Sequence, residues 1–236
     1  MNKESAVYRD IRGEEYADIA SRILYEDNHV LVFNKKAGEI VQGDKTGDEP
    51  LPETLKAFIA KRDSKPGKVF MGVPHRLDRP VSGAVVFAKT SKALERLTAS
   101  FRDSKASKIY WALTSGMPDP LSGEIRTYLI RNEKQNKSYS SALPKPGAKE
   151  AALRYRFLRS TKSYNLLEIE LLTGRHHQIR CQLASIGCPI KGDLKYGAKR
   201  SNPDGSISLH ARKITFPHPT LGKEITAIAP TPMEDM

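Results

Sequence analysis

The chain has 236 residues and a formal net charge of +12, with 39 lysines and arginines against 27 aspartates and glutamates. This excess favours a partner rich in phosphate, such as a nucleic acid, over a membrane surface. Two cysteines are too few for a disulfide framework, and no apolar stretch is long enough to span a bilayer.

The positive charge is concentrated in two segments. Residues 131–162 hold nine basic residues against two acids, and residues 175–200 hold six against one. Runs of like charge are usually solvated surface, but two such runs also fit a folded basic cleft.

The first twenty residues mix charges without periodicity and lack the apolar core of a secretory signal. We therefore expect a loosely docked arm over residues 1–20 and a cytoplasmic protein. The remaining length suits one large domain, which we place at 21–230.

The first half of the chain predicts a hairpin, a helix, a strand and a second helix. Asp27 and Asn28 separate two short apolar runs and favour the tight turn of the hairpin. The second helix is the clearest, because Thr90 or Ser91 can cap its start and apolar residues then recur every three or four positions. These elements are expected at 23–33, 55–62, 84–88 and 91–101.

The second half predicts a series of strands and one helix. Residues 132–149 are polar, basic and contain prolines, so we expect a long exposed loop there. Strands dominate and the helices intervene irregularly, which predicts an α+β fold with a mixed, largely antiparallel sheet and flanking helices. The helix is expected within 173–187, and the strands at 109–113, 121–130, 152–158, 165–172, 207–209, 214–216 and 224–228.

The most informative string is HRLDRPVSG, which holds Asp78 between Arg76 and Arg79 just before an apolar strand. Such an aspartate is either part of a structural ion pair or a carboxylate kept ionised for chemistry. These residues alone leave both interpretations open.

A second basic cluster, TGRHHQIR, begins the helix of the second half. Helix N-termini and guanidinium groups both stabilise anions, so a fold that brings Arg175 to Asp78 would keep that carboxylate charged and oriented. Although His176, His177 and Cys181 are close in sequence, we expect no metal site. Adjacent histidines on a helix point in different directions, and no second half-site is present.

Several strings occur in the order expected of the RluA family of RNA pseudouridine synthases. HRLDRPVSG is followed by FAKT, KIYWAL, LLTGRHHQIR, GCPIKGD and SLHARKITFPHP. The resemblance covers roughly residues 23–228, so the chain is identified as a member of that family. Only about twenty residues precede the match, and we expect no S4-like RNA-binding module there. Two flanking positions depart from the family pattern, Val81 for a frequent threonine and Gln182 for a frequent histidine, and both bear on substrate choice.

The resemblance implies the pseudouridine synthase fold, a sheet core with a central active-site cleft. It implies isomerisation of specific uridines in structured rRNA or tRNA, without cofactor or metal, by cleaving the glycosidic bond and rejoining uracil to ribose through C5. Asp78 matches the catalytic aspartate, which acts by covalent attack or by assisting proton removal from the sugar. Tyr110 matches the tyrosine that lies against the base, and Arg175 matches the basic partner of the aspartate.

The target uridine must leave its stack to reach a carboxylate, at a cost of a few kcal/mol. Phosphate contacts from the basic segments would offset that cost and weaken with salt. In the family, the arginine matched by Arg76 holds the RNA open, and an apolar residue resembling Leu209 packs near the base. We expect a monomer whose partner is RNA and not a membrane. The residues expected to bind RNA are His75, Arg76, Arg79, His177, Gln178, Arg180 and Leu209.

Two other functions fit parts of the sequence. A non-catalytic RNA-binding protein could keep the same scaffold, and it would bind RNA equally well after Asp78→Asn without forming a modified nucleotide. A carboxylate-based glycoside hydrolase normally needs a second acid near the first, and no acid other than Asp78 is singled out by these strings.

Overall fold

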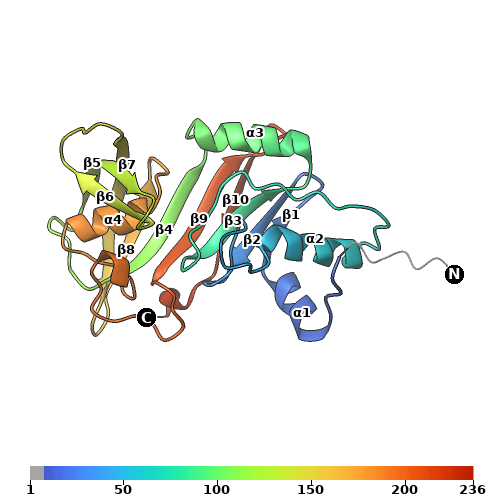
Figure 1. The fold of residues 1–236 in the computed structure, drawn as a ribbon, viewed down its shortest axis with the longest axis horizontal. Helices are drawn as coiled ribbons and strands as arrows, with labels where there is room; N and C mark the ends of the chain where they lie inside the picture. Colours follow the sequence, from blue (N-terminus) through green and yellow to red (C-terminus); the bar gives the residue numbers. More distant parts are fainter. Residues whose placement is uncertain (1–7, 236) are drawn as a thin grey trace.

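The computed structural model describes residues 8–235, and within them four α-helices flank a ten-stranded sheet (Figure 1). This confirms the predicted α+β class. The helices are α1 (Gly13–Ser21), α2 (Leu51–Arg62), α3 (Ser91–Arg102) and α4 (Gln178–Ser185). The strands are β1 (Ile23–Glu26), β2 (Val30–Lys35), β3 (Ser82–Ala88), β4 (Ser107–Thr114), β5 (Ser122–Asn132), β6 (Lys137–Ser141), β7 (Lys149–Ser160), β8 (Asn165–Leu171), β9 (Leu209–Pro217) and β10 (Glu224–Ile228).

The strands follow the order β1-β2-β3-β9-β4-β8-β7-β5-β6, and β10 pairs with β9. Only the β3–β9 pair is parallel among the described strands, so the sheet is mixed and largely antiparallel, as predicted. Strand β4 is at the middle of this order, between β9 and β8. In Figure 1, α1 and α2 lie beside one half of the sheet and α4 beside the other.

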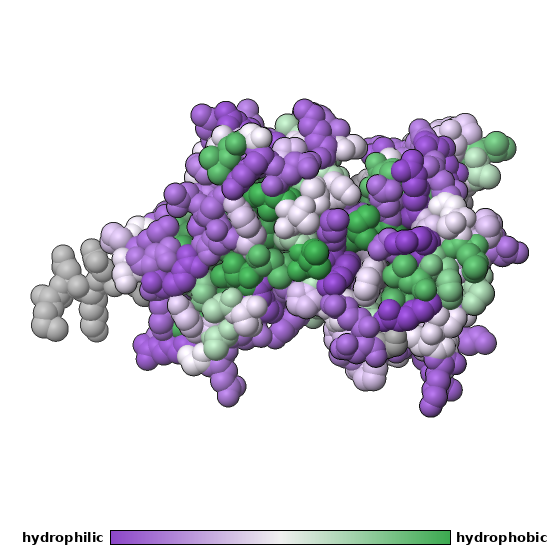
Figure 2. Space-filling model, turned by 180° about the vertical axis from the view of Figure 1, so that it is seen from behind, coloured by the Kyte–Doolittle hydropathy of each residue, from purple (hydrophilic) through white to green (hydrophobic). Residues whose placement is uncertain are grey.

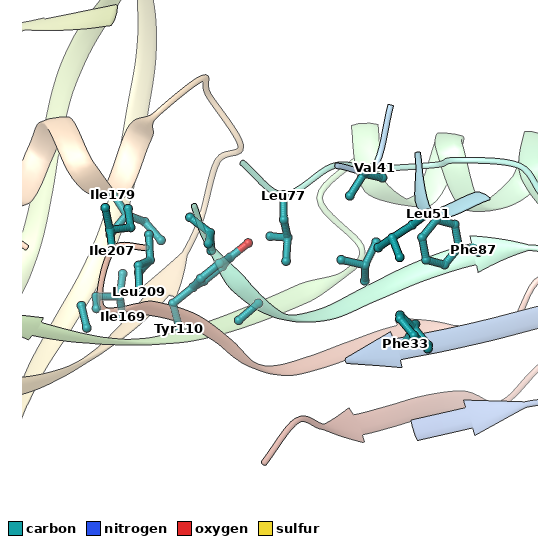
Figure 3. Packing of buried hydrophobic residues seen from close by; sticks show 14 of the residues in the cluster. Phe33, Val41, Leu51, Leu77, Phe87, Tyr110, Ile169, Ile179, Ile207 and Leu209 are labelled. Atoms are coloured by element: carbon teal, nitrogen blue, oxygen red, sulfur yellow. The ribbon is translucent and has the colours of Figure 1, made fainter. Parts of the chain in front are cut away.

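Strands β2 and β3 are buried on both faces, which explains why their sequences read as unbroken apolar runs. Phe33 and Phe87 pack into one cluster of buried residues, while Val32 and Val86 pack into a second cluster that includes residues of α3. Figure 3 shows the first cluster extending along the sheet, with Tyr110 between its two ends. The outer surface seen in Figure 2 is mostly hydrophilic, with apolar side chains gathered in patches.

Gly83 allows β3 and β9 to approach closely at the start of their parallel pairing. Its φ is +115°, and a Cβ built there would lie 2.4 Å from the carbonyl oxygen of Ala211. Only glycine fits this backbone and this contact. Next to it, Ser82 Oγ lies 2.8 Å from His210 Nδ1. The two strands therefore hold the segment that precedes β3, including Asp78, against the centre of the sheet.

The expectation of a loosely docked arm is wrong for residues 8–20. Residues 13–21 form α1, and Ile11 and Ile19 are fully buried in the cluster that also contains α2. A helix of nine residues with so few apolar positions gives little periodic signal, so tertiary packing decides its place. Residues 1–7 lie outside the described part of the chain.

The expected loop over 132–149 is also wrong in part, because residues 137–141 form β6 in a hairpin with β5. The sequence KSYSS has no apolar alternation, and the strand is held by pairing and by contacts to the rest of the fold. Its Ser138 is buried, and the amide of Ser138 donates to the hydroxyl of Tyr196 at 2.8 Å. The runs expected at 207–209 and 214–216 belong largely to one strand, β9. The other predicted elements are confirmed, with small shifts of their ends.

Candidate active site

A cleft of about 1310 Å³ lies between the segment before β3, the end of α3, β4 and the loop that leads into α4. Nine lysines and arginines line it, against three acids. The two basic segments of the sequence supply four of these cations, Arg131, Arg175, Arg180 and Lys195. The basic cleft is therefore present, but other segments contribute more than half of its positive charge.

Asp78 lies in this cleft with a third of its side chain exposed. Arg180 reaches it from the first turn of α4, where Nη1 donates to Asp78 Oδ2 at 3.3 Å. The same guanidinium donates through Nε and Nη2 to both carboxylate oxygens of Asp193, at 2.6 and 2.9 Å. Both Arg180 and Asp193 are buried. One arginine thus connects an accessible carboxylate to an inaccessible one.

The charge of Arg180 is secured by these partners. Burial alone would lower the pKa of the guanidinium, but the hydrogen bonds and the negative charges of Asp193 and Asp78 together raise it above its ordinary value. Arg180 therefore stays cationic, and the bidentate contact with Asp193 fixes its orientation.

The cation in contact with Asp78 is Arg180 and not Arg175. Arg175 is exposed, and its Nε donates to the carbonyl oxygen of Glu150 at 2.9 Å. Its amide donates to Gln178 Oε1 at 3.0 Å, which closes the loop before α4 begins. The predicted partner of Asp78, Arg175, is therefore wrong, and the observed partner lies five residues further along the chain. The helix starts only after Arg175, and its first turn directs Arg180 toward the cleft.

Tyr110 rises from β4 and points its hydroxyl toward the segment that carries Leu77, as Figure 3 shows. Only 7% of the residue is exposed. Burial, and then the negative charge of Asp78, raise the pKa of its phenol, so it is protonated at neutral pH. Leu209, which was expected near the base, is buried in the same cluster and lines the cleft.

His177 lies beside Asp78 as a neutral imidazole. It stands just before α4 in the left-handed conformation, with φ of 52°. Its Nε2 is 3.5 Å from Asp78 Oδ2, and its Nδ1 is 3.0 Å from the hydroxyl of Tyr196. Burial, and then the charge of Arg180, lower the pKa of His177 to about 2. The ring of His176 stacks on it at 3.8 Å between centroids.

Two residues expected to bind RNA make their contacts inside the protein. His75 Nε2 accepts a hydrogen bond from the amide of Val86 at 3.0 Å, and its ring stacks on Phe101. Burial, and then the charge of Lys108, lower the pKa of His75 to about 3, so it is neutral. Gln178 is buried, and its amide nitrogen donates to the carbonyl of Ala152 at 3.0 Å.

The remaining two residues that were expected to bind RNA, Arg76 and Arg79, are exposed and line the cleft. Arg76 Nη1 donates to Gln42 Oε1 at 2.9 Å. Arg79 forms ion pairs with Asp44 and Asp48 of the loop before α2. Arg76 is therefore free of carboxylates within the described residues, whereas the charge of Arg79 is largely balanced.

Lys35 is a site residue that the sequence reasoning missed. It is 1% exposed, and its Nζ donates to the carbonyl oxygens of Lys36, Arg79 and Val81 at 3.0, 3.1 and 2.6 Å. It thereby clamps the backbone that follows Asp78. The only signal in the sequence was a pair of lysines, Lys35 and Lys36, at the end of an apolar strand. Burial lowers the pKa of Lys35 to about 8.

In the range from residue 8 to residue 235, no group of three or more histidine, cysteine, aspartate or glutamate side chains is placed to hold a metal ion. Within the same range, no helix has both the length and the apolar composition needed to cross a bilayer.

Comparisons with known proteins identify the family of this chain. The family model described as RNA pseudouridylate synthase matches residues 29–185. The chain is 34% identical over 214 residues to an uncharacterized RNA pseudouridine synthase of Synechocystis, covering 89% of this chain and 65% of that protein. It is 32% identical over 220 residues to ribosomal large subunit pseudouridine synthase C of Vibrio cholerae, covering 91% and 67%.

The chain thus spans about two thirds of the length of these relatives. Among solved structures, human RNA pseudouridylate synthase domain containing 4 shares the fold, with a TM-score of 0.76 and 24% identity over 92% of this chain and 91% of that one. The matched family model and the curated relatives lead to one conclusion. The chain belongs to the RluA family of RNA pseudouridine synthases.

Proposed function

We propose that this protein isomerises uridines of structured ribosomal or transfer RNA to pseudouridine, and that it does so in the cytoplasm as a monomer. The observation that carries the proposal is the meeting of Asp78, Arg180 and Tyr110 in one basic cleft. The cleft brings an accessible carboxylate, a fixed cation and an aromatic face together. Those are the groups that chemistry on an extruded nucleoside requires.

In the proposed reaction the bond between uracil N1 and ribose C1′ breaks, the uracil turns, and a bond forms between C5 and C1′. C5 loses a proton and N1 gains one, so the atoms balance and no cofactor or metal is consumed. Asp78 acts on the nucleoside, either by attack at C1′ or by assisting proton removal from the sugar. Arg180 donates a hydrogen bond to the carboxylate and fixes its position, which is the role expected of Arg175.

Tyr110 offers its ring to the base and its hydroxyl to the side of the cleft that carries Asp78. Because its phenol is protonated at neutral pH, it must release that proton before it can accept the one from C5. Its buried position beside Leu209 gives the uracil an apolar surface. This compensates in part for the stacking lost when the nucleotide leaves the RNA helix.

The excess of cations in the cleft supplies phosphate contacts, which position the RNA without reading its sequence. Several relatives are named as ribosomal large subunit pseudouridine synthases, which makes large-subunit rRNA the first RNA to map. Carbodiimide labelling of total RNA, from cells with and without the gene, would locate the uridines. Loss of label at defined positions is the expected result.

Catalysis is tested directly by release of tritium from RNA that carries the label at uracil C5. We expect release by the wild-type protein, none by Asp78→Asn, and RNA binding by both. Asp63→Asn, at a carboxylate that pairs with Arg62 outside the cleft, is the matched control and keeps full activity. Release by Asp78→Asn at the wild-type rate would remove Asp78 from the mechanism.

The same experiment separates the two rival functions. A protein that only binds RNA releases no tritium and leaves the carbodiimide map unchanged. A glycoside hydrolase needs a second free carboxylate, whereas the other cleft acids, Asp44 and Glu170, each pair with an arginine. Such an enzyme would also release free uracil, and none is expected here.

A further inference from the structure

Lys108 differs from the other cations of the cleft in its surroundings. It stands two residues before Tyr110 on β4, and both side chains line the cleft, while Ile109 between them lines a smaller pocket on the other side of the strand. Its ammonium lies 5.9 Å from the ring centroid of Phe101. On the opposite side, a Cβ built on Gly174 would come within 3.4 Å of Nζ. The lysine thus bridges the two walls of the cleft.

Within residues 8–235, the ammonium group of Lys108 forms no ion pair and no hydrogen bond. Arg79 and Arg180 are paired with carboxylates, and Lys195 donates to two carbonyl oxygens. Burial lowers the pKa of Lys108, because little around it replaces the water it has lost. His75, whose pKa is lowered first by burial and then by the charge of Lys108, is neutral and offers no negative charge. A partly buried ammonium without a counter-ion is unfavourable until an anion arrives.

We propose that Lys108 binds a backbone phosphate of the nucleotide that enters the cleft, or of its immediate neighbour. The proposal rests on the proposed function, because it takes RNA as the ligand. Two residues along a strand span about 7 Å, so a base lying against Tyr110 brings a phosphate within reach of the lysine. A lysine recognises phosphate as a compact point charge and contributes nothing to base choice.

The first test measures the salt dependence of binding to an unmodified transcript of large-subunit rRNA. For Lys108→Met we expect the slope of log K against log salt concentration to become less steep by about 0.7 to 0.9, the value of one phosphate contact. Lys108→Arg keeps the charge and the wild-type slope. Lys162→Met is the matched control, because Lys162 is exposed in the turn between β7 and β8, at the far end of β8 from the cleft. Thermal melting of each variant verifies that it folds.

The second test locates the phosphate. In short RNAs around the mapped uridine, single neutral methylphosphonate linkages replace each phosphate in turn. Replacing the contacted phosphate should weaken binding by the wild-type protein about tenfold. The same replacement should not weaken binding by Lys108→Met, which already lacks the contact. An unchanged salt slope, or additive losses at every linkage, would overturn the proposal. A wild-type protein that binds RNA with the expected slopes but releases no tritium would overturn the proposed function and leave this phosphate contact standing.

Discussion

Asp193 holds Arg180 through both oxygens of a fully buried carboxylate, and Arg180 in turn reaches Asp78 with its remaining terminal nitrogen. Because one cation is shared between two carboxylates, the three side chains together keep one negative charge. Asp78 is the member of the set whose carboxylate is exposed to the cleft. A sugar that gains positive character at C1′ would be stabilised there.

Replacing Asp193 by asparagine tests this arrangement. Asp193→Asn keeps the shape but leaves the charge of Arg180 to Asp78 alone, so the aspartate becomes less available for attack. We expect single-turnover tritium release to slow by at least about tenfold, or about 1.4 kcal/mol in the barrier, with RNA affinity within about threefold of wild type. Removing one partner of a buried pair should also destabilise the fold by about 3 kcal/mol in urea unfolding. A variant that loses stability but keeps its rate would reduce Asp193 to a structural role.

Much of the order of elements was predictable because periodicity and capping are local signals. Thr90, for example, was expected to cap a helix, and its hydroxyl oxygen accepts a hydrogen bond from the amide of Ala93 at 3.1 Å. Strand β6 and helix α1 were missed because their sequences lack apolar periodicity. Pairing with β5 places the first, and burial of Ile11 and Ile19 places the second.

In the candidate site, too, some residues could be predicted from local sequence and others could not. Asp78 stands out in a local string, but its cationic partner depends on where α4 begins and on which arginine meets the buried Asp193. The contact with Asp193, thirteen residues along the chain, is not encoded in the residues around Arg180. Lys35 is less visible still, because its role consists of contacts with backbone carbonyls that only the folded chain brings together.

Gly83→Ala should be strongly destabilising. The added Cβ would overlap the backbone of Ala211 at 2.4 Å in a conformation that residues with side chains rarely adopt. We expect a loss of about 3 kcal/mol or more in the free energy of unfolding, measured with urea. Gly67→Ala is the matched control, since no atom lies within 4 Å of its built Cβ, and it should change stability by less than about 0.5 kcal/mol. Equal stability of the two variants would contradict the close approach of β3 and β9.

Lys35 predicts a pH dependence of stability with a definite sign. Its pKa is about 8 in the folded protein and about 10.5 in the unfolded chain. Below about pH 8 both states are protonated and the cost of burying the charge is fully present. Between the two values the folded protein releases the proton and the unfolded chain keeps it, so the wild-type protein gains stability as pH rises.

Against Lys35→Met, that gain in the free energy of unfolding should reach about 2 kcal/mol between pH 7.5 and pH 10, measured by urea unfolding. The exposed Lys162→Met serves as the control and should follow the wild-type curve. Parallel curves for the wild-type protein and Lys35→Met would mean that the buried ammonium titrates as it does in water.

The last prediction concerns Arg79, which lines the cleft but pairs with Asp44 and Asp48. These side chains are about half exposed, and water and salt screen such surface pairs, so a phosphate can compete for the guanidinium. Asp44→Asn combined with Asp48→Asn removes two negative charges that face the RNA and frees a cation. We expect RNA to bind about three- to tenfold more tightly at low salt, with a steeper salt dependence.

The matched control removes two carboxylates from an arginine outside the cleft, with Glu26→Gln and Asp63→Asn at Arg62. It lowers the negative charge of the protein by the same amount, so long-range attraction of RNA rises equally in both double variants. Only the cleft variant also frees a guanidinium at the binding surface, so its gain in affinity should exceed that of the control. Equal gains would show that Arg79 does not contact RNA, and a loss confined to the cleft variant would show that the loop of Asp44 and Asp48 itself binds the substrate.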